Sequence, residues 1–525
     1  MFELVLQNGV IVDGSAQPRF LGDVAIEKGR IGAISRRGGT LPGREVLDCR
    51  GLVVAPGFVD VHSHADRSVM ESPLNRSGLA QGITTVLAGH CGGSAAPLSP
   101  AMKERWLARM AAWGLDPAGP AERHWTTLGE FLSYVESRGT GVNIALLVGQ
   151  GTVRDFVMGH DQRPATPAEI RCMQDLVEAS MAAGAFGLSA GRSYVPGKYA
   201  PAGEVLELCR AAAKWGGLYA CHLISEGERL FEALDEALGI GRDTGMPVQV
   251  VHCKVWGKPN WGQAPRLLRT IEQARESGVD VLLDVYPYNY SQVFSLRQRL
   301  GRLLPPDLTG ALAALEDQRV LDALEKELAQ DRELPGLGIA WCDGTPEAVG
   351  STVGEFADAQ GLSLARAIAQ LLLRNQLQVK VAGLMDEEEV KRILKHPFAM
   401  VSTDAGGRDS LEDPMGTVHP RAYGTYPRVL GRYVRDEAVL GLEEAVYKMT
   451  TLPARRARLA GRGLLAVGYW ADVVVFDPAQ VRETSTLDRP GAYPLGIRHV
   501  LVNGRLAVSH GRLLDVRAGR VLRHS

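Results

Sequence analysis

Short runs of apolar residues alternate with helical patterns along the middle of the chain. One helical pattern runs from Ala168 to Ala183, with Thr166 placed to cap it and Pro167 at its first turn, and another runs from Arg229 to Thr244. This alternation is typical of βα units built on a parallel sheet. Eight candidate strands end near His64, Gly89, Gly149, Ser189, His222, His252, Tyr286 and Asp404. Eight such strands predict an α/β fold closed as a (β/α)8 TIM barrel.

The two ends of the chain differ from its middle. Residues 1–52 and 463–525 alternate short strands with tight turns such as Asn-Gly and Lys-Gly, which favours hairpins. We expect the two ends to combine into one small β-sandwich domain beside a barrel that spans residues 53–462. Residues 290–339 are rich in Leu, Arg and Glu and are longer than a normal βα connection, so we interpret them as an inserted helical segment. This segment could cover the mouth of the barrel or be a peripheral decoration.

Composition and charge are those of an ordinary globular enzyme. Of 525 residues, 45% are hydrophobic and 22% are charged, which suits a sizeable core. The net charge of −2 and the lack of a long Lys/Arg run argue against a binder of nucleic acid or anionic membrane, so a small-molecule substrate is favoured. No signal peptide or membrane span is visible, and seven cysteines, an odd number, favour reduced thiols. These features predict a cytoplasmic protein.

Two histidines, His62 and His64, end the first candidate strand with a spacing of i, i+2. Side chains two apart on a strand share one face, so these imidazoles would project together as metal ligands do. The alternative is a buried strand whose histidines satisfy hydrogen bonds in the core. The pair alone leaves both interpretations open.

Four further polar residues follow other candidate strands: Cys91, His222, His252 and Asp404. Singly, each has a structural explanation, such as a core histidine, an inert buried thiol or a helix cap. The glycines around Cys91 favour a close approach of the backbone there. Catalytic groups of a TIM barrel lie at the carboxyl ends of its strands, where all these residues fall. The set therefore predicts a metallohydrolase in which Asp404 is the general base.

Five segments carry a resemblance to a known family, and they run from the first strand to beyond the last. They are Pro56-Gly-Phe-Val-Asp-Val-His-Ser-His-Ala-Asp, Gly82-Ile-Thr-Thr-Val-Leu-Ala-Gly-His-Cys-Gly-Gly-Ser, Gly257-Lys-Pro-Asn-Trp-Gly, Asp284-Val-Tyr-Pro-Tyr and His419-Pro-Arg-Ala-Tyr-Gly-Thr-Tyr-Pro-Arg-Val-Leu-Gly. The chain resembles the D-aminoacylase (N-acyl-D-amino-acid deacylase) family of the amidohydrolase superfamily. The first segment is general to the superfamily, and the cysteine and His-Pro-Arg segments are specific to the narrower family.

The resemblance implies hydrolysis of N-acyl-D-amino acids to a carboxylic acid and a free D-amino acid. It implies one tight zinc ion (Zn2+) held by Cys91, His222 and His252, and a second, weaker metal position at His62 and His64. The resemblance also implies that Lys254, Tyr286 and Arg421 bind the carboxylate of the substrate. From its place at the end of the fourth candidate strand, Ser189 is expected to line the pocket.

Three positions depart from the family pattern. Ile224 stands where relatives carry Arg, and His90 and Gln150 stand where Asn and His are expected. An apolar residue at position 224 predicts a preference for substrates with hydrophobic side chains. Two alternatives stay open: a related amidohydrolase acting on a cyclic amide, a dipeptide or another N-acyl compound, and a non-catalytic barrel that binds metal or a partner. The oligomeric state stays open too.

Overall fold

The core of the fold is a ring of parallel strands, formed by two sheets that meet at the bridge between Ser63 and Ala405 and at the junction of β8 (Asn143–Leu146) and β9 (Val148–Gly149). The computed structural model describes residues 1–36, 41–105, 124–300, 304–305, 307–331, 333–412 and 418–524. The strands of the ring are β6 (Phe58–Ser63), β7 (Ile83–Ala88), β8 (Asn143–Leu146), β9 (Val148–Gly149), β10 (Gly187–Gly191), β11 (Leu218–His222), β12 (Val248–Val250), β13 (Val281–Val285) and β17 (Ala399–Val401). One residue separates β8 from β9, so these two are halves of one strand.

Neighbouring strands of the ring pair in parallel in chain order, from β6 to β17. The ring closes where Ser63 forms a parallel bridge with Ala405 and the Asp404 N–H donates to the His62 carbonyl over 3.0 Å. Every residue of these strands is buried, because helices cover the outside and side chains fill the inside. The predicted parallel α/β barrel is confirmed, and its strands end near the predicted positions, with the largest difference at β17, which ends at Val401 and not at Asp404.

The helices that accompany the barrel follow their capping signals. In α6, Thr166 and Glu169 form a reciprocal capping box and Pro167 occupies the first turn. The helices outside the insertion include α1 (Ala65–Ser68), α2 (Arg76–Ala80), α4 (Leu128–Arg138), α5 (Gln150–Met158), α6 (Pro167–Ala182), α7 (Ala202–Ala213), α8 (Leu230–Thr244), α9 (Ala264–Glu276), α15 (Glu387–Lys395), α16 (Arg421–Arg428), α17 (Leu442–Met449) and α18 (Thr451–Arg456). Short 3-10 helices are η1 (Gly197–Tyr199), η2 (Lys258–Asn260), η3 (Leu334–Gly336) and η4 (Pro346–Ala348), and α16 continues into a π-helix, η5 (Val429–Asp436).

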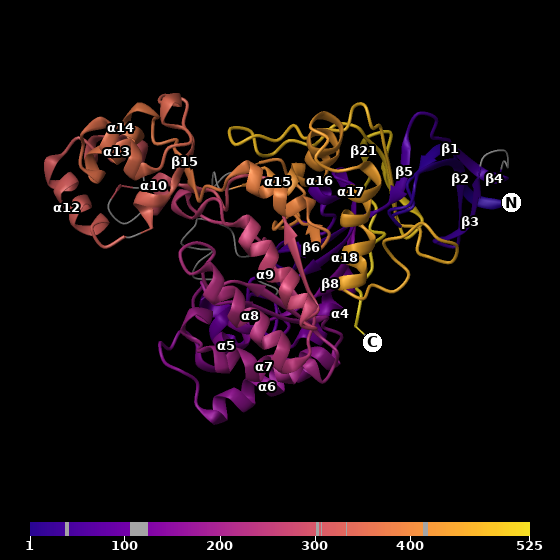
Figure 1. The fold of residues 1–525 in the computed structure, drawn as a ribbon, viewed down its shortest axis with the longest axis horizontal. Coiled ribbons are helices and arrows are strands. Elements are labelled where there is room, and N and C mark those ends of the chain that lie inside the picture. The colour runs from indigo at the N-terminus through magenta and orange to yellow at the C-terminus, as the bar shows by residue number, and fades with distance from the viewer. Residues whose placement is uncertain are drawn as a thin grey trace.

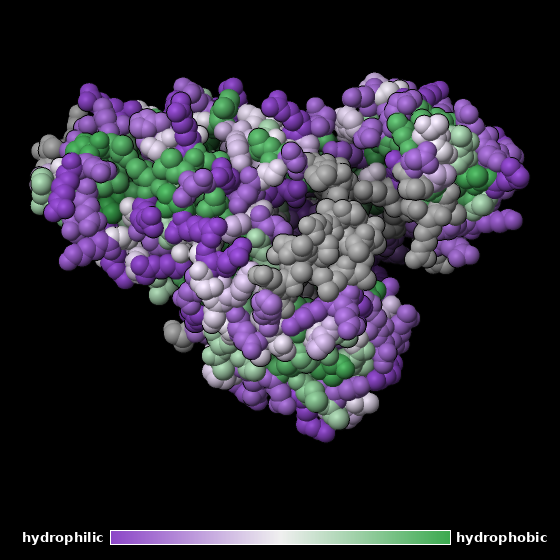
Figure 2. Space-filling model, turned by 180° about the vertical axis from the view of Figure 1, so that it is seen from behind, coloured by the Kyte–Doolittle hydropathy of each residue, from purple (hydrophilic) through white to green (hydrophobic). Residues whose placement is uncertain are grey.

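Both ends of the chain contribute to one sheet beside the barrel, on the right of Figure 1. Its strands are β1 (Phe2–Ile11), β2 (Phe20–Glu27), β3 (Arg30–Arg36), β4 (Gly43–Asp48), β5 (Val53–Pro56), β18 (Val473–Phe476), β19 (Ile497–Val502), β20 (Arg505–Ser509) and β21 (Arg512–Leu513). β5 joins the two ends, because it pairs with β1 and with β18. This sheet therefore includes residues just beyond position 52. In the view from behind, hydrophobic residues gather on this lobe (Figure 2), and Leu21, Val46 and Val467 are among its exposed apolar side chains.

A helical lobe follows β13 and stands apart from the barrel at the upper left of Figure 1. Its elements are β14 (Phe294–Ser295), α10 (Leu296–Arg299), α11 (Leu308–Ala314), α12 (Gln318–Leu328), β15 (Gly338–Trp341), α13 (Val353–Gln360), α14 (Leu364–Arg374) and β16 (Lys380–Ala382). The lobe has its own apolar core and a three-stranded sheet in which β16 lies between β14 and β15. It extends beyond residue 339, where the sequence pattern placed its end, because β15 pairs back onto β16.

An ion pair buried between α5 and α7 supplies a test of the fold. Arg154 Nη1 donates to both carboxylate oxygens of Glu204, at 2.7 and 2.6 Å, and both side chains are buried. Glu204→Gln removes the charge that balances Arg154, so we expect a loss of about 3–5 kcal/mol in the free energy of unfolding. Urea denaturation measures it. Glu207→Gln, farther along α7, is the control and should lower the free energy of unfolding by about 1 kcal/mol or less. Equal losses of stability in the two variants would contradict a special role for the buried Arg154–Glu204 pair.

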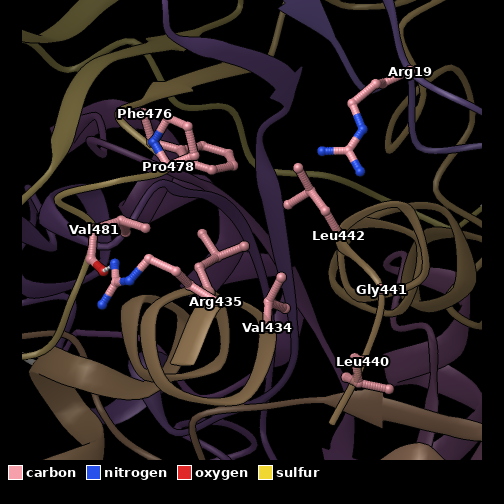
Figure 3. Close-up of a pocket in the computed structure, with 10 residues that line it drawn as sticks. Arg19, Val434, Arg435, Leu440, Gly441, Leu442, Phe476, Pro478 and Val481 are labelled. Atoms are coloured by element: carbon pink, nitrogen blue, oxygen red, sulfur yellow. Dashed lines mark hydrogen bonds between the residues drawn. The ribbon is translucent and has the colours of Figure 1, made fainter. Parts of the chain in front are cut away.

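A cavity of about 290 Å³ lies between η5 and the end of β18 (Figure 3). Its lining is mostly apolar, and its two arginines already have partners. Arg19 pairs with Glu443 at 2.8 Å, and Arg435 pairs with Asp436 at 2.7 Å. None of the candidate metal ligands lines this cavity. The candidate chemistry is elsewhere, at the carboxyl ends of the barrel strands.

Candidate metal centre

The barrel brings the six candidate metal and base residues together at the carboxyl ends of its strands. Their possible ligand atoms form two groups, each with all its atoms within 4.8 Å of one another. One group contains Cys91, His222 and His252, and the other contains His62, His64, Cys91 and Asp404. Cys91 belongs to both groups. The arrangement therefore offers two adjacent metal positions that share one sulfur.

Short distances define both groups. Cys91 Sγ lies 3.5 Å from His62 Nε2 and 3.5 Å from His252 Nε2. His252 Nε2 also lies 2.6 Å from His222 Nδ1. In the second group, Asp404 Oδ1 lies 3.3 Å from His62 Nε2 and 3.1 Å from the nearest nitrogen of His64.

The chemistry of these donors fits zinc. Zinc accepts imidazole nitrogen, thiolate sulfur and carboxylate oxygen, and three protein ligands leave a fourth position for water or substrate. The pKa of Cys91 is raised by burial, but the charges of His62 and His252 outweigh this effect and hold it well below its usual value. The thiolate form, which is the form that ligates metals, is thus favoured before any metal binds.

The loop that carries Cys91 needs its neighbouring glycines. A Cβ on Gly92 would lie 2.6 Å from the Gly191 backbone nitrogen, and Gly92 itself has a φ of 72°. The expectation of close backbone approach at this loop is therefore confirmed.

Three of the candidate site residues have left-handed backbones. Cys91, His252 and Asp404 have φ values of 55°, 36° and 48°. Such conformations cost a non-glycine residue about 1–3 kcal/mol each and persist where the surroundings determine them. The barrel packing thus holds these side chains in positions that a relaxed chain would not adopt.

A buried carboxylate that the sequence pattern did not single out orients His62. Asp284 Oδ1 lies 3.0 Å from His62 Nδ1, and it accepts the His252 backbone N–H at 2.9 Å and the Ser402 hydroxyl at 2.6 Å. A partner on Nδ1 leaves Nε2 free to face a metal, which is a common second layer around metal-binding imidazoles. The signal in the sequence was the position of Asp284 near the carboxyl end of the apolar run that forms β13.

Asp404 lies in an electrostatic environment that keeps it ionised. Burial raises its pKa, but the charges of Arg421, His62 and His252 outweigh burial and hold the pKa well below the usual value. Arg421 Nη1 lies 2.9 Å from Asp404 Oδ2. Among the described residues after Asp404, no helix begins before α16 at Arg421, so Asp404 is not the helix cap that formed the structural alternative.

The three predicted carboxylate-binding residues lie beside this group. The Arg421 guanidinium carbon lies 4.6 Å from the centre of the Tyr286 ring, and Lys254 Nζ lies 5.8 Å from the same ring. All three side chains are buried. The Tyr286 hydroxyl has no hydrogen-bond partner among the described residues. Two cations and a free hydroxyl donor therefore converge next to the candidate metal ligands.

Ser189 lies near the carboxyl end of β10, and its hydroxyl is bonded to the backbone of the loop around Cys91. Its hydroxyl donates to the Gly89 carbonyl at 2.6 Å and accepts the Gly92 N–H at 3.2 Å, and the residue is fully buried. These bonds hold both ends of the loop around Cys91 and leave the hydroxyl committed to backbone. Ser189 therefore supports the loop around Cys91, and its place on the pocket wall stays a prediction.

Two other polar residues near the site, Tyr194 and Glu226, were not among the residues predicted from the sequence. The ring of Tyr194, about half-exposed, lies 4.9 Å from the ring of His222. Glu226 Oε1 lies 2.8 Å from His252 Nδ1 and 2.5 Å from Lys254 Nζ. Both residues come from loops after strands, where sequence spacing cannot specify contacts.

The departures from the family pattern surround the site. The ring of His90 lies 4.4 Å from that of His62, and Gln150 begins α5. The polar side-chain atoms of His90 and Gln150 are buried without hydrogen-bond partners among the described residues. Ile224 is half-buried and packs against the barrel core.

The helical lobe reaches the site through two loops. Lys258, in the loop after β12, pairs with Glu355 of α13 at 2.6 Å, and Trp256 of the same loop packs against the core of the lobe. Gln292, before β14, accepts from Arg421 Nη2 at 3.3 Å. These contacts join the lobe to segments that carry Lys254 and Arg421. A cover over the barrel mouth stays a prediction.

The comparisons with known proteins agree along the whole chain. An amidohydrolase family model matches residues 45–508. D-aminoacylase from Alcaligenes xylosoxydans xylosoxydans is 38% identical over 521 residues, 99% of this chain and 97% of that protein. N-acyl-D-glutamate deacylase from the same organism is 36% identical over 521 residues, 99% of this chain and 96% of that protein.

A solved structure shows the same agreement in three dimensions. N-acyl-D-glutamate deacylase from Bordetella bronchiseptica, in complex with zinc and a phosphonate inhibitor that mimics the tetrahedral intermediate of its reaction, is 35% identical. The match covers 99% of each chain with a TM-score of 0.77. The resemblance found in the five sequence segments is confirmed. The chain therefore belongs to the amidohydrolase family, and within it to the D-aminoacylase family of N-acyl-D-amino-acid deacylases.

Proposed function

We propose that this protein is a zinc-dependent hydrolase of N-acyl-D-amino acids that releases a carboxylic acid and a free D-amino acid. The observation that carries the proposal is the convergence of two metal-ligand groups, an ionised carboxylate and a cationic pocket on one end of the barrel. The names of the full-length relatives support this reaction class.

Cys91, His222 and His252 would hold the tight zinc ion, and His62 and His64 would hold a weaker one beside the shared Cys91. When bound, zinc would lower the pKa of a water molecule and polarise the substrate carbonyl. The partial exposure of His64, 22% of its side chain, leaves this group accessible from solvent.

Asp404 would move the proton. Its carboxylate would accept a proton from the attacking water and deliver it to the departing amine nitrogen. Arg421 supports the first of these roles, because its positive charge at 2.9 Å favours the ionised carboxylate.

Lys254, Arg421 and Tyr286 would bind the α-carboxylate of the substrate. The two cations supply charge, and the Tyr286 hydroxyl supplies a hydrogen-bond donor. A free α-carboxylate on the substrate would complement this pocket, which favours a linear N-acyl-amino acid over a cyclic amide that carries no carboxylate. The retention of all six metal and base positions argues against a non-catalytic barrel.

The substrate is a small molecule, and we place the enzyme in the cytoplasm. All seven cysteines are free, which suits a reducing compartment. No helix among the described residues is both long and apolar enough to cross a bilayer.

The preferred substrate side chain is hydrophobic in this proposal. The sequence identities to a D-aminoacylase, 38%, and to an N-acyl-D-glutamate deacylase, 36%, are too similar to show which substrate side chain is preferred. Ile224 supplies an apolar side chain where a cation would be needed to receive a second carboxylate. A charged substrate side chain would lose water there without gaining a partner.

A substrate panel tests this function. We expect kcat/KM for N-acetyl-D-leucine and N-acetyl-D-phenylalanine to exceed that for N-acetyl-D-aspartate and N-acetyl-D-glutamate by about tenfold or more, because an unpaired polar group costs about 1–3 kcal/mol. Ile224→Arg is the matched variant and should narrow the difference. Faster turnover of the acidic substrates by the wild type would show that Ile224 does not set the polarity of the pocket, and no turnover of any member would refute the function.

A further inference from the structure

Glu226 places one carboxylate between a candidate metal ligand and a candidate substrate-binding residue. The residue lies in the loop after β11, four positions beyond His222. Its Oε1 atom lies 2.8 Å from His252 Nδ1 and 2.5 Å from Lys254 Nζ. The exposed side-chain fractions are 14% for Glu226, 3% for His252 and 5% for Lys254. These contacts are therefore largely shielded from water.

The side chains of Glu226, His252 and Lys254 complement one another as hydrogen-bond donors and acceptors. His252 turns Nε2 toward Cys91 and His222, so this nitrogen must keep its lone pair to serve as a ligand. Its Nδ1 atom then carries the proton and needs an acceptor. The Lys254 ammonium cannot accept, because it has only donors.

Without the carboxylate, two donors would face each other. Lys254 Nζ lies 2.7 Å from His252 Nδ1. Glu226 Oε1 accepts from Lys254 Nζ and lies close enough to His252 Nδ1 to accept its proton as well, so one carboxylate can serve both donors. An ammonium group has three N–H bonds, so Lys254 keeps donors for a substrate carboxylate while it is held by Glu226.

The backbone around Glu226 is held in place as well. Its carbonyl accepts the Trp256 N–H at 2.8 Å, and Trp256 packs against the core of the helical lobe. The loop after β11 and the loop after β12 are thereby joined at the position where the side chains meet. The carboxylate is thus fixed at both its backbone and its side chain.

We propose that Glu226 is a positioning residue that sets zinc affinity through His252 and substrate affinity through Lys254. Glu226 is not a member of either candidate ligand group, so it would act through His252 and Lys254. The zinc effect follows from the geometry of the ligand, and the substrate effect rests on the proposed function of Lys254. One side chain would therefore link how well the site holds its metal to how well it holds the carboxylate of the substrate.

The test uses the full chain with Glu226→Gln, Glu226→Asp, Lys254→Met and the double variant Glu226→Gln/Lys254→Met. The control is Glu228→Gln, an exposed carboxylate two residues away. Zinc affinity is measured by competition with a chelator, without substrate. KM and kcat are measured with N-acetyl-D-leucine on zinc-saturated protein, and thermal unfolding shows that each variant is folded.

We expect Glu226→Gln to weaken zinc binding by about 10- to 100-fold, which is the usual effect of removing the hydrogen-bond partner of a metal-binding imidazole. KM should rise by about tenfold or more, since a hydrogen bond to a charged group is lost. In the Lys254→Met background the zinc effect should persist, while Glu226→Gln should no longer raise KM. Glu226→Asp should recover part of both losses, and Glu228→Gln should match the wild type.

Zinc affinity of Glu226→Gln within about threefold of the wild type would overturn the metal role. If Glu226→Gln raises KM by the same factor in the wild type and in the Lys254→Met variant, the proposed role of Glu226 in substrate binding is wrong. If Glu226→Gln does not fold, Glu226→Asp carries both comparisons, because it keeps the charge and shortens the reach. If the wild type cleaves no N-acyl-D-amino acid, the proposed function fails, whereas the chelator competition still decides the role of Glu226 toward the metal.

Discussion

Cys91→Ala should give a folded protein that holds little zinc and whose kcat/KM is lower than that of the wild type by more than about 100-fold. Loss of a residue that only hydrogen-bonds to a metal ligand already lowers metal affinity or activity by about 10- to 100-fold, and Cys91 is itself a candidate ligand. The expected effect is large because Cys91 belongs to both ligand groups. Its sulfur lies 3.5 Å from one imidazole nitrogen of each group. Alanine removes the thiolate from both metal positions at once. Elemental analysis of purified protein gives the zinc content, and amine release gives the activity.

Cys172→Ala is the control for this experiment, because Cys172 is an exposed free cysteine on α6. It should retain the zinc content and activity of the wild type. A Cys91→Ala protein with a normal zinc content would remove Cys91 from the ligand set. Thermal unfolding shows whether Cys91→Ala is folded. If it is not, Cys91→Ser is used in its place, because serine is similar in size to cysteine but lacks the thiol.

Asp404→Asn should lower kcat by about 10²- to 10⁴-fold, the usual contribution of a general acid or base. Asparagine keeps the shape of the side chain but cannot accept and return a proton. The zinc of the tight group should remain, because Asp404 is not a member of that group. Zinc content and kcat with N-acetyl-D-leucine are measured on the same preparation.

Asp235→Asn, which alters an exposed carboxylate paired with Arg242, is the control and should leave kcat unchanged. A decrease in kcat of less than about tenfold for Asp404→Asn, below the range for acid–base catalysis, would contradict the role of the base. Loss of the tight zinc together with kcat would instead show that Asp404 supports the metal.

Much of the barrel could be predicted from the sequence because its strands are buried on both faces. Each strand is therefore a short apolar run, and the polar residue after the run marks its carboxyl end. The pattern at His62 and His64 is the clearest example, since the i, i+2 spacing already places both on one face. Parallel pairing then brings residues that are far apart in the chain, such as Cys91 and His252, to one end of the ring.

The pattern failed where contacts depend on tertiary structure. The helical lobe continues to Ala382 because α13 and α14 have the same apolar periodicity as the barrel helices, so no change of composition marks its end. Asp284 and Glu226 lie next to ligand imidazoles only after the loops and strands are folded. The bonds of Ser189 to Gly89 and Gly92 likewise form only in the folded barrel, so the sequence pattern could not predict that Ser189 anchors this loop.

The most direct test of the proposed function is the release of free amine from a pair of mirror-image substrates as zinc is returned to chelated protein. N-acetyl-D-leucine and N-acetyl-L-leucine differ only in configuration, and the same protein without zinc supplies the baseline. We expect amine to appear from the D substrate as zinc is added, the L substrate to react far more slowly, and the zinc-free protein to be inactive. Full activity without zinc, or equal rates with the D and L substrates, would contradict the proposed function.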